Sequence, residues 1–414
     1  MFKPELLAPA GAREKLELAL AYGADAVYMA GKSFGLRAGA GNFADAELED
    51  AIKLCHERGA RCYLTLNTVA RGYELDALGD FAAYAADCGA DAAIISDLGV
   101  FSVVKRRAPS LELHVSTQAG VTNRESASMW HDLGAKRVIL ARELSLDEIV
   151  DIRVGTPKAL DLETFVHGAM CVSFSGRCLL SNYLTGRDAN RGECAQPCRW
   201  SYRIAEEKNP GEFFPIEEHA EGAYILNSKD LCAVRLLSDI VAAGVTSLKI
   251  EGRSKSAYYA AAVTSAYRDA INDFVSGKPF DEKWYAELDK VSHRPYCEGF
   301  FNGTPDEPIQ YFKSSAYIRD WDVCAIVTEV DENGATVSLK NPFSVGESLE
   351  LMTPGAEVAT VTVTEILCLD ENGEAESVPR AYKNQSIHRI KLSDDSPSSS
   401  ELTVKKYSIL RKRG

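Results

Sequence analysis

The sequence of 414 residues contains no apolar run long enough to cross a membrane as a helix. Its first residues, Met1 to Gly11, also lack the continuous apolar stretch of a secretory signal peptide. We therefore expect a cytoplasmic protein without membrane contact, in a compartment that keeps thiols reduced. The length is too great for one hydrophobic core, which indicates two or three domains.

Positive charge is in short supply, because 60 acidic residues outnumber 46 basic ones and leave a formal net charge of −14. This balance disfavours indiscriminate binding of nucleic acid, although a local basic surface would still attract an anionic ligand. One such stretch, Lys405 to Gly414, carries five positive charges and no negative charge. Two interpretations of it stay open: a solvated terminus and a contact with RNA.

Several motifs of nucleotide- and metal-dependent enzymes are missing. The sequence has no Walker A loop, no H-E-x-x-H and no G-x-G-x-x-G after its first apolar run. Residues Gly31 to Gly35 do match the G-x-S-x-G pattern of a nucleophile elbow. A glycine-rich run follows them instead of a helix start, and Ser33 has no evident histidine and acidic partners. We interpret this segment as a strand-end loop and expect no intrinsic peptidase activity.

The first 275 residues repeat one theme, in which a short apolar run and a turn precede an amphipathic helical stretch. Many runs follow a Gly-Ala pair, where glycine suits the left-handed residue that ends a helix. Eight such runs in about 250 residues predict a (β/α)8 barrel, and an open doubly wound sheet is the alternative. The runs are Glu5–Ala10, Ala26–Ala30, Arg61–Asn67, Ala92–Asp97, Leu111–Gln118, Arg137–Glu143, Glu163–Gly168 and Ser247–Gly252.

The remaining sequence predicts a second domain. Residues 276–318 have the composition of a connector, and from 319 to 414 the apolar period changes to two. Asn333-Gly334 between two alternating runs is a strong hairpin signal. We expect a small antiparallel β barrel or sandwich. Its predicted strands are Val323–Val330, Ala335–Lys340, Ser348–Met352, Glu357–Leu367 and Gln385–Leu392.

Four of the eleven cysteines lie in one unusually long connection, residues 169–246, between the seventh and eighth predicted strands. Their spacing is Cys171-x6-Cys178-x15-Cys194-x3-Cys198. The clustering and the odd total argue against a disulfide framework. Four thiolates from one loop suit either a tetrahedral zinc or an iron–sulfur cluster. Zinc sites usually use two close pairs, so the spacing favours a cluster, and Cys232 is an alternative ligand.

Polar residues at the ends of other predicted strands should face the same cavity, since a barrel's active site lies at the C-terminal ends of its strands. Some of them should instead form the polar layer that closes the barrel. Arg142, Lys249 and Arg253 together would suit a carboxylate or phosphate. The candidates are Gln118, Arg142, Glu143, His167, Lys249, Glu251 and Arg253.

At these residues the sequence resembles the collagenase-like peptidase family, once classed as peptidases of unknown catalytic type. The resemblance covers nearly the whole chain. The matching segments are Leu7–Gly11, His167–Cys171, Ser175–Cys178, Arg187–Cys194, Cys198–Trp200, Asn227–Leu231, Leu248–Arg253, Phe343–Gly346 and Leu349–Pro354.

Within that family the chain is most similar to the prephenate-dependent tRNA hydroxylases, which form 5-hydroxyuridine at the wobble position without molecular oxygen. The resemblance implies a 4Fe-4S cluster on Cys171, Cys178, Cys194 and Cys198, with prephenate as co-substrate and the tRNA anticodon loop as partner. Sister branches hydroxylate ribosomal RNA or a ubiquinone precursor. A peptidase and a non-catalytic RNA-binding protein with a structural cluster are the alternatives from other classes. The sequence leaves the oligomeric state open.

The cysteine-bearing loop also supplies a focused basic surface. It carries Arg177, Arg187, Arg191 and Arg199 against Asp188 and Glu193. Tyr183 and Trp200 are suited to stack on an extruded base, which is how single-stranded RNA loops are usually recognised. We therefore expect the loop to contact the anticodon loop, with prephenate held deeper in the barrel mouth.

Overall fold

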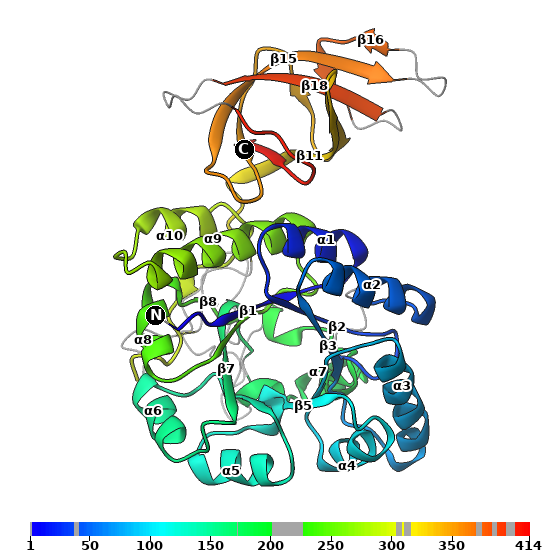
Figure 1. The fold of residues 1–414 in the computed structure, drawn as a ribbon, viewed down its shortest axis with the longest axis vertical. Helices are drawn as coiled ribbons and strands as arrows, with labels where there is room; N and C mark the ends of the chain where they lie inside the picture. Colours follow the sequence, from blue (N-terminus) through cyan, green and yellow to red (C-terminus); the bar gives the residue numbers. More distant parts are fainter. Residues whose placement is uncertain are drawn as a thin grey trace, which may run out of the picture.

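The computed structural model describes residues 2–36, 41–171, 173–200, 227–303, 309, 316–369, 375–382, 387–394 and 402–414. Two parts are evident in Figure 1: an α/β barrel in the lower half and a β domain above it. No helix among the described residues is long and apolar enough to cross a membrane.

Eight parallel strands form a closed barrel, which confirms the predicted (β/α)8 architecture. The first strand pairs with the second on one side and with the last on the other, and the last also pairs with the seventh, so the sheet has no free edge. This closure excludes the open doubly wound sheet. The strands are β1 (Glu5–Pro9), β2 (Ala26–Met29), β3 (Arg61–Leu66), β4 (Ala92–Ile95), β5 (Glu112–Val115), β6 (Arg137–Ile139), β7 (Asp161–Ala169) and β9 (Ser247–Ile250).

Helices follow the strands and cover the outside of the barrel (Figure 1). Several begin at a side-chain cap, such as Ser145, whose hydroxyl accepts from the Glu148 amide. Gly89 follows one of them with φ +92°, in line with the predicted role of the Gly-Ala pairs. The helices are α1 (Arg13–Ala21), α2 (Asp45–Glu57), α3 (Leu75–Asp87), α4 (Leu98–Arg107), α5 (Arg124–Asp132), α6 (Leu146–Val154), α8 (Leu237–Ala242) and α9 (Ala257–Val275).

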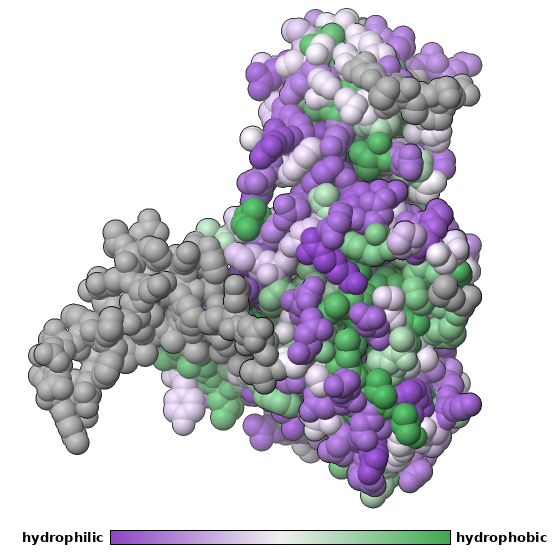
Figure 2. Space-filling view, turned by 90° about the vertical axis from the view of Figure 1, so that its left-hand side faces the viewer, coloured by the Kyte–Doolittle hydropathy of each residue, from purple (hydrophilic) through white to green (hydrophobic). Residues whose placement is uncertain are grey.

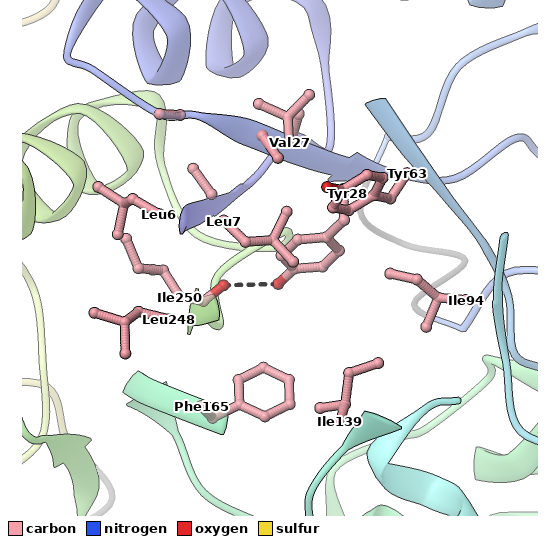
Figure 3. Close-up of a cluster of buried hydrophobic side chains, with 14 of the residues drawn as sticks. Leu6, Leu7, Val27, Tyr28, Tyr63, Ile94, Ile139, Phe165, Leu248 and Ile250 are labelled. Atoms are coloured by element: carbon pink, nitrogen blue, oxygen red, sulfur yellow. Dashed lines mark hydrogen bonds between the residues drawn. The ribbon is translucent and has the colours of Figure 1, made fainter. Parts of the chain in front are cut away.

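Side chains from the strands fill the barrel and its surroundings with a continuous apolar core. Figure 3 shows Leu7, Tyr28 and Phe165 among the residues gathered there. The Tyr28 hydroxyl donates to the carbonyl oxygen of Ile250 over 2.9 Å, which satisfies a polar group inside the core. This packing fixes the strand ends that carry the polar candidates.

The segment expected as a connector is more ordered than the sequence indicated. It contains α10 (Glu282–Leu288) and β10 (Tyr296–Cys297). The latter pairs in parallel with β8 (Asp230–Cys232), which itself runs antiparallel to β7. These short strands extend the barrel sheet beside the cysteine-bearing loop.

The C-terminal domain is an antiparallel barrel of six strands, closed by pairing of β14 with β15. Asn333-Gly334 lies at the turn between its first two strands, as predicted. The barrel consists of β11 (Trp321–Asp331), β12 (Gly334–Leu339), β14 (Ser348–Met352), β15 (Ala359–Leu369), β18 (Ile387–Asp394) and β19 (Ile409–Arg413). Short strands β13 (Phe343–Ser344), β16 (Ala375–Ser377) and β17 (Arg380–Ala381) accompany it.

The basic tail is not simply a solvated terminus, because its second half is strand β19. Ile409 and Leu410 are buried, and the strand pairs with β11 and β14. The guanidinium of Arg411 is fully buried and bonds Glu287 of α10 at 2.5 Å and Glu350 of β14 at 2.8 Å, so this residue joins the two domains. Lys405, Lys406 and Arg413 are exposed, and a contact of the tail with RNA stays a prediction.

Candidate active site

A cavity of about 130 Å³ opens at the C-terminal ends of the barrel strands. Six of the seven polar candidates line it, as do all four clustered cysteines. The structure thus brings together residues that are up to 135 positions apart in the chain, from Gln118 to Arg253. The residues concerned are Gln118, Arg142, Glu143, Lys249, Glu251, Arg253, Cys171, Cys178, Cys194 and Cys198.

His167 is the predicted residue that the structure does not bring to this cavity. Its ring is buried among Tyr259, Tyr267 and Tyr296, at centroid distances of 5.4 to 5.9 Å. Burial lowers the pKa of the imidazole to about 3, and neither ring nitrogen has a hydrogen-bond partner among the described residues. The pairing of β7 with β9 shifts register between Phe165 and His167. Such a bulge interrupts the alternation of side chains, so His167 does not follow Phe165 into the cavity.

Gly168 allows this irregularity. It has φ +107°, and a Cβ atom there would lie 2.4 Å from the carbonyl oxygen of Glu251. Only glycine fits so close to the neighbouring backbone in that conformation. The close approach sets the position of Glu251, whose amide donates to the His167 carbonyl over 2.9 Å.

Lys249 lies at the floor of the cavity in a buried ion-pair network. Its ammonium bonds Glu163 at 2.9 Å, and Arg137 bonds the other Glu163 oxygen at 2.9 Å and Glu5 at 2.5 Å. Burial alone would raise the pKa of Glu163, but Lys249 and Arg137 hold it at about 2. Lys249 therefore belongs in part to the polar layer that closes the barrel, as the sequence analysis allowed for some candidates.

Arg142 forms one wall of the cavity. Its guanidinium stacks 3.8 Å from the Phe165 ring centroid and donates to the carbonyl oxygen of Ala169 over 2.7 Å. The carboxylate of Glu251 is 3.8 Å away. Ala169 begins the cysteine-bearing loop, so this arginine holds the loop's origin against the barrel.

Arg253 crosses the cavity from the end of β9. It is 3% exposed and donates to the Thr65 hydroxyl over 3.2 Å and to the carbonyl oxygen of Leu36. Its own carbonyl accepts from Lys15 over 2.8 Å. These contacts place a buried guanidinium beside the apolar wall of Tyr28 and Phe165.

Glu143 anchors the cysteine-bearing loop. One carboxylate oxygen accepts from the Ser175 amide over 2.7 Å and the other from the Ser175 hydroxyl over 2.9 Å. Ser175 is buried and has φ +46°, an uncommon conformation for a residue with a side chain. The two bonds to Glu143 stabilise that turn between Cys171 and Cys178, so Glu143 positions the loop.

The four clustered cysteines share the wall of this cavity. The pKa of the Cys198 thiol is raised to about 11, mainly by burial. The nearby thiols of Cys171, Cys194 and Cys178 also raise this pKa, and the positive charge of Arg199 lowers it. Among the described residues, no three cysteine, histidine or carboxylate side chains are close enough to hold a single metal ion.

Cys232, the alternative ligand, lies elsewhere. It is buried in β8 opposite His167, and burial raises the pKa of its thiol to about 12. It lines neither this cavity nor the larger one described below. Cys55 and Cys62 are fully buried in the core, whereas Cys88 is half-buried.

The expected basic surface is only partly available. Arg191 forms a two-bond ion pair with Glu74, with distances of 2.8 and 2.6 Å. Arg177 and Arg187 are exposed, as are Tyr183 at 83% and Trp200 at 43%. The loop therefore presents two aromatic side chains and two exposed arginines, while Arg191 supports the loop. Its continuation, residues 201–226, lies outside the described residues.

Sequence reasoning missed a buried ion pair that supports the end of the cysteine-bearing segment at Arg199. Asp230 and Arg294 form a fully buried ion pair, and Arg294 donates to the Asn227 side-chain oxygen over 3.1 Å. The same oxygen accepts from Arg199 over 3.4 Å, which ties the residue after Cys198 to the barrel. Nothing in the sequence indicated that Asp230 and Arg294 are buried. A buried charge needs an opposite charge and hydrogen bonds, which these two residues supply to each other.

Comparison with known proteins follows from this architecture. Residues 11–310 match the family described as Peptidase family U32, and residues 319–411 match its C-terminal domain. The chain belongs to peptidase family U32.

Relatives in this family carry different names. The tRNA hydroxylation protein P of Escherichia coli is 36% identical over 92% of this chain and 92% of its own length. The 23S rRNA 5-hydroxycytidine C2501 synthase of Escherichia coli is 32% identical over 84% of this chain and 52% of its own length. A collagenase of Porphyromonas gingivalis is 33% identical over 72% of this chain and 73% of its own length.

Proposed function

We propose that this chain is an oxygen-independent RNA hydroxylase that forms 5-hydroxyuridine at the tRNA wobble position. One observation supports this most: four clustered thiols meet buried cations at the mouth of the barrel, in a relative of tRNA hydroxylation protein P. The reaction exchanges the hydrogen on carbon 5 of uridine for a hydroxyl group, a two-electron oxidation in which the co-substrate must supply the hydroxyl group and take up the hydrogen. Prephenate is the proposed co-substrate.

A 4Fe-4S cluster on Cys171, Cys178, Cys194 and Cys198 fits the donor set. The four thiols line one cavity, and four cysteine thiolates are the ligand set of a 4Fe-4S cluster. When bound, such a cluster supplies one-electron redox chemistry.

Prephenate carries two carboxylates, and the cavity offers cations for them. Arg142, Lys249 and Arg253 all line the cavity. Guanidinium groups bind carboxylates through two parallel hydrogen bonds, and low exposure strengthens those bonds. Phe165 and Tyr28 supply an apolar wall for the ring of the same molecule. In this arrangement the protein binds and orients the co-substrate and excludes water from it.

The exposed side of the loop suits RNA. Tyr183 and Trp200 present aromatic surface for an unpaired base, and Arg177 and Arg187 present charge for phosphates. An anticodon loop offers both, whereas a duplex keeps its bases stacked. This supports a single-stranded substrate at the thiol-bearing side of the barrel mouth.

Two other functions compete with this proposal. A sister hydroxylase acting on ribosomal RNA is favoured by the rRNA synthase relative, and one acting on a ubiquinone precursor would use the same barrel mouth. Peptidase activity is favoured by the family name and the collagenase relative. Ser33 is exposed in an irregular segment, and its described contacts include no hydrogen bond to a histidine or carboxylate. A serine without such partners is a weak nucleophile.

Nucleoside mass spectrometry separates these functions. A strain lacking the gene should lose wobble 5-hydroxyuridine from total tRNA, and the wild-type gene should restore it where a Cys194→Ala gene does not. Ribosomal 5-hydroxycytidine and ubiquinone from the same cells report on the sister activities. Unchanged 5-hydroxyuridine, in a strain with no second route to it, would refute the tRNA assignment. Collagen cleavage by the pure protein that disappears in Ser33→Ala would support the peptidase instead.

A further inference from the structure

A second and larger cavity, of about 690 Å³, lies between the barrel and the C-terminal domain. We infer that this interdomain cleft binds the single-stranded RNA on either side of the modified base. The inference rests on the proposed function and assigns the C-terminal domain a part in holding substrate. Figure 2 shows one side of the junction, with hydrophilic side chains gathered where the two domains meet.

More cations than carboxylates line the cleft, although the protein as a whole is strongly acidic. Arg199, Lys255, Arg319 and Lys340 line it, against the carboxylates of Glu14 and Glu251. One of those carboxylates, Glu14, is 2.8 Å from the Lys340 ammonium, and the Arg319 side chain is 66% exposed. A local excess of cations in a concave site focuses the field and attracts a polyanion despite the net charge of −14.

Aromatic rings accompany these cations. Tyr317 is 42% exposed, and the Lys255 ammonium lies 4.1 Å from its ring centroid. Trp321 lines the same wall at the start of β11. A cationic groove with aromatic faces is how proteins bind single strands, because phosphates pair with the cations and bases stack on the rings. Duplex RNA would offer the phosphates alone, so the pattern favours a single strand.

The cleft is continuous with the proposed active site. Cys171, Cys194 and Cys198 line both cavities, together with Met170 and Glu251. The thiols therefore form the wall between a narrow mouth and a wide cleft. About 690 Å³ is within the range of sites that enclose a nucleotide-sized ligand.

The cleft is also preformed, because buried contacts fix the domains around it. Arg411 joins α10 to the C-terminal barrel. Its guanidinium cannot move without breaking its bonds to Glu287, Glu350 and Tyr258. On the other side, the Tyr22 hydroxyl donates to the Met352 carbonyl over 2.8 Å. A site that needs no closure loses less entropy when it binds ligand.

Binding of a labelled anticodon stem-loop RNA to the anaerobically purified, iron-loaded protein tests the inference. Arg319→Ala should weaken binding about fivefold and make the salt dependence of log K shallower by about 0.7, since one phosphate contact is lost. Arg319→Lys, which keeps the charge, should bind within about twofold of wild type. Tyr317→Ala should weaken binding at least about fivefold through lost stacking. Arg106→Ala, an exposed arginine of α4 on the far end of the barrel, is the matched control (Figure 1).

Turnover measurements distinguish a failure of this inference from a failure of the proposed function. The Arg319→Ala and Tyr317→Ala proteins should need more tRNA for half-maximal rate, with the dependence on prephenate unchanged. If wild type modifies tRNA but both variants bind RNA and turn it over like the Arg106→Ala control, the cleft is not the RNA site and the inference fails alone. If wild-type protein neither binds nor modifies tRNA, the proposed function fails and the inference falls with it.

Discussion

The barrel mouth and the interdomain cleft share three cysteines, yet they use their cations differently. In the mouth, Lys249 and Arg253 are almost completely buried and bonded to the protein. In the cleft, Arg319 is mostly exposed, and its ion pair with Asp322 is 3.3 Å long. Buried, bonded cations give fixed geometry for a small anion, whereas exposed ones give charge to a long polyanion whose phosphates can shift. One wall of thiols therefore borders a cavity with buried, bonded cations and a cavity with an exposed cation.

Removal of a thiol from the mouth should have the largest effect. Cys178 lines the mouth but not the cleft. Cys178→Ala should reduce bound iron and sulfide to near zero and abolish hydroxylation, because the proposed cluster would lose one of its four ligands. Cys55→Ala is the control, since Cys55 is buried in α2 and should leave the metal content unchanged.

Metal analysis of anaerobically purified protein gives the answer directly. A Cys178→Ala protein with wild-type iron would contradict the cluster. If Cys198→Ala kept the iron and Cys232→Ala lost it, the fourth ligand would be Cys232, against its buried position in β8.

Substitution of Arg411, which joins the two domains beside the cleft, should have the next largest effect. Arg411→Ala should lower the free energy of unfolding by about 3–5 kcal/mol, because Glu287 and Glu350 are left without their buried partner. Arg319→Ala, at an exposed ion pair, should cost less than about 1 kcal/mol. Urea unfolding of the two variants measures this difference. Similar small losses in both would show that the domain junction is not held by Arg411.

Arg253 lines the mouth but not the cleft, so its substitution tests the mouth alone. Arg253→Ala should lower kcat about a hundredfold, since a buried cation that orients the co-substrate is lost. Affinity for tRNA and iron content should stay at wild-type values. Steady-state kinetics and RNA binding on the same preparation make the comparison. A loss of tRNA affinity as large as the loss of kcat would contradict the separation of the two cavities.

The smallest effect distinguishes two arginines of the cysteine-bearing loop. Arg187→Ala should weaken tRNA binding about threefold and make its salt dependence shallower, because an exposed phosphate contact is lost. Arg191→Ala should leave the salt dependence unchanged, since Glu74 already neutralises that guanidinium. Binding isotherms at several salt concentrations check both. Equal changes in slope would mean that Arg191 leaves Glu74 to meet RNA.

The sequence was sufficient for the barrel because eight apolar runs alternate with amphipathic helical stretches, and each run became a strand. It was sufficient for the thiols because four cysteines in one polar loop have few structural explanations. It placed His167 wrongly, since a register shift between two paired strands leaves no trace in one of them. It misread the tail at Arg411 for a related reason. Whether a basic strand faces solvent or a buried carboxylate depends on partners 61 and 124 residues away.

The interdomain cleft was beyond sequence reasoning altogether. Glu14, Lys255, Tyr317 and Lys340 come from four distant segments, and none belongs to a motif. Their proximity depends on how the second domain docks on α9 and α10. Docking is decided by side-chain pairs such as Lys290 with Glu350, which look like ordinary surface charges in the sequence.

The bond between Glu143 and Ser175 has a consequence for cofactor assembly. It ties the turn between Cys171 and Cys178 to the barrel through oxygen and nitrogen atoms, with no thiol taking part. The loop is therefore held in register by the protein itself, and the ordering entropy of that turn is lost when the chain folds. The proposed cluster would therefore form on a loop whose turn between Cys171 and Cys178 is already ordered, unlike a metal-dependent finger, which folds only when metal binds.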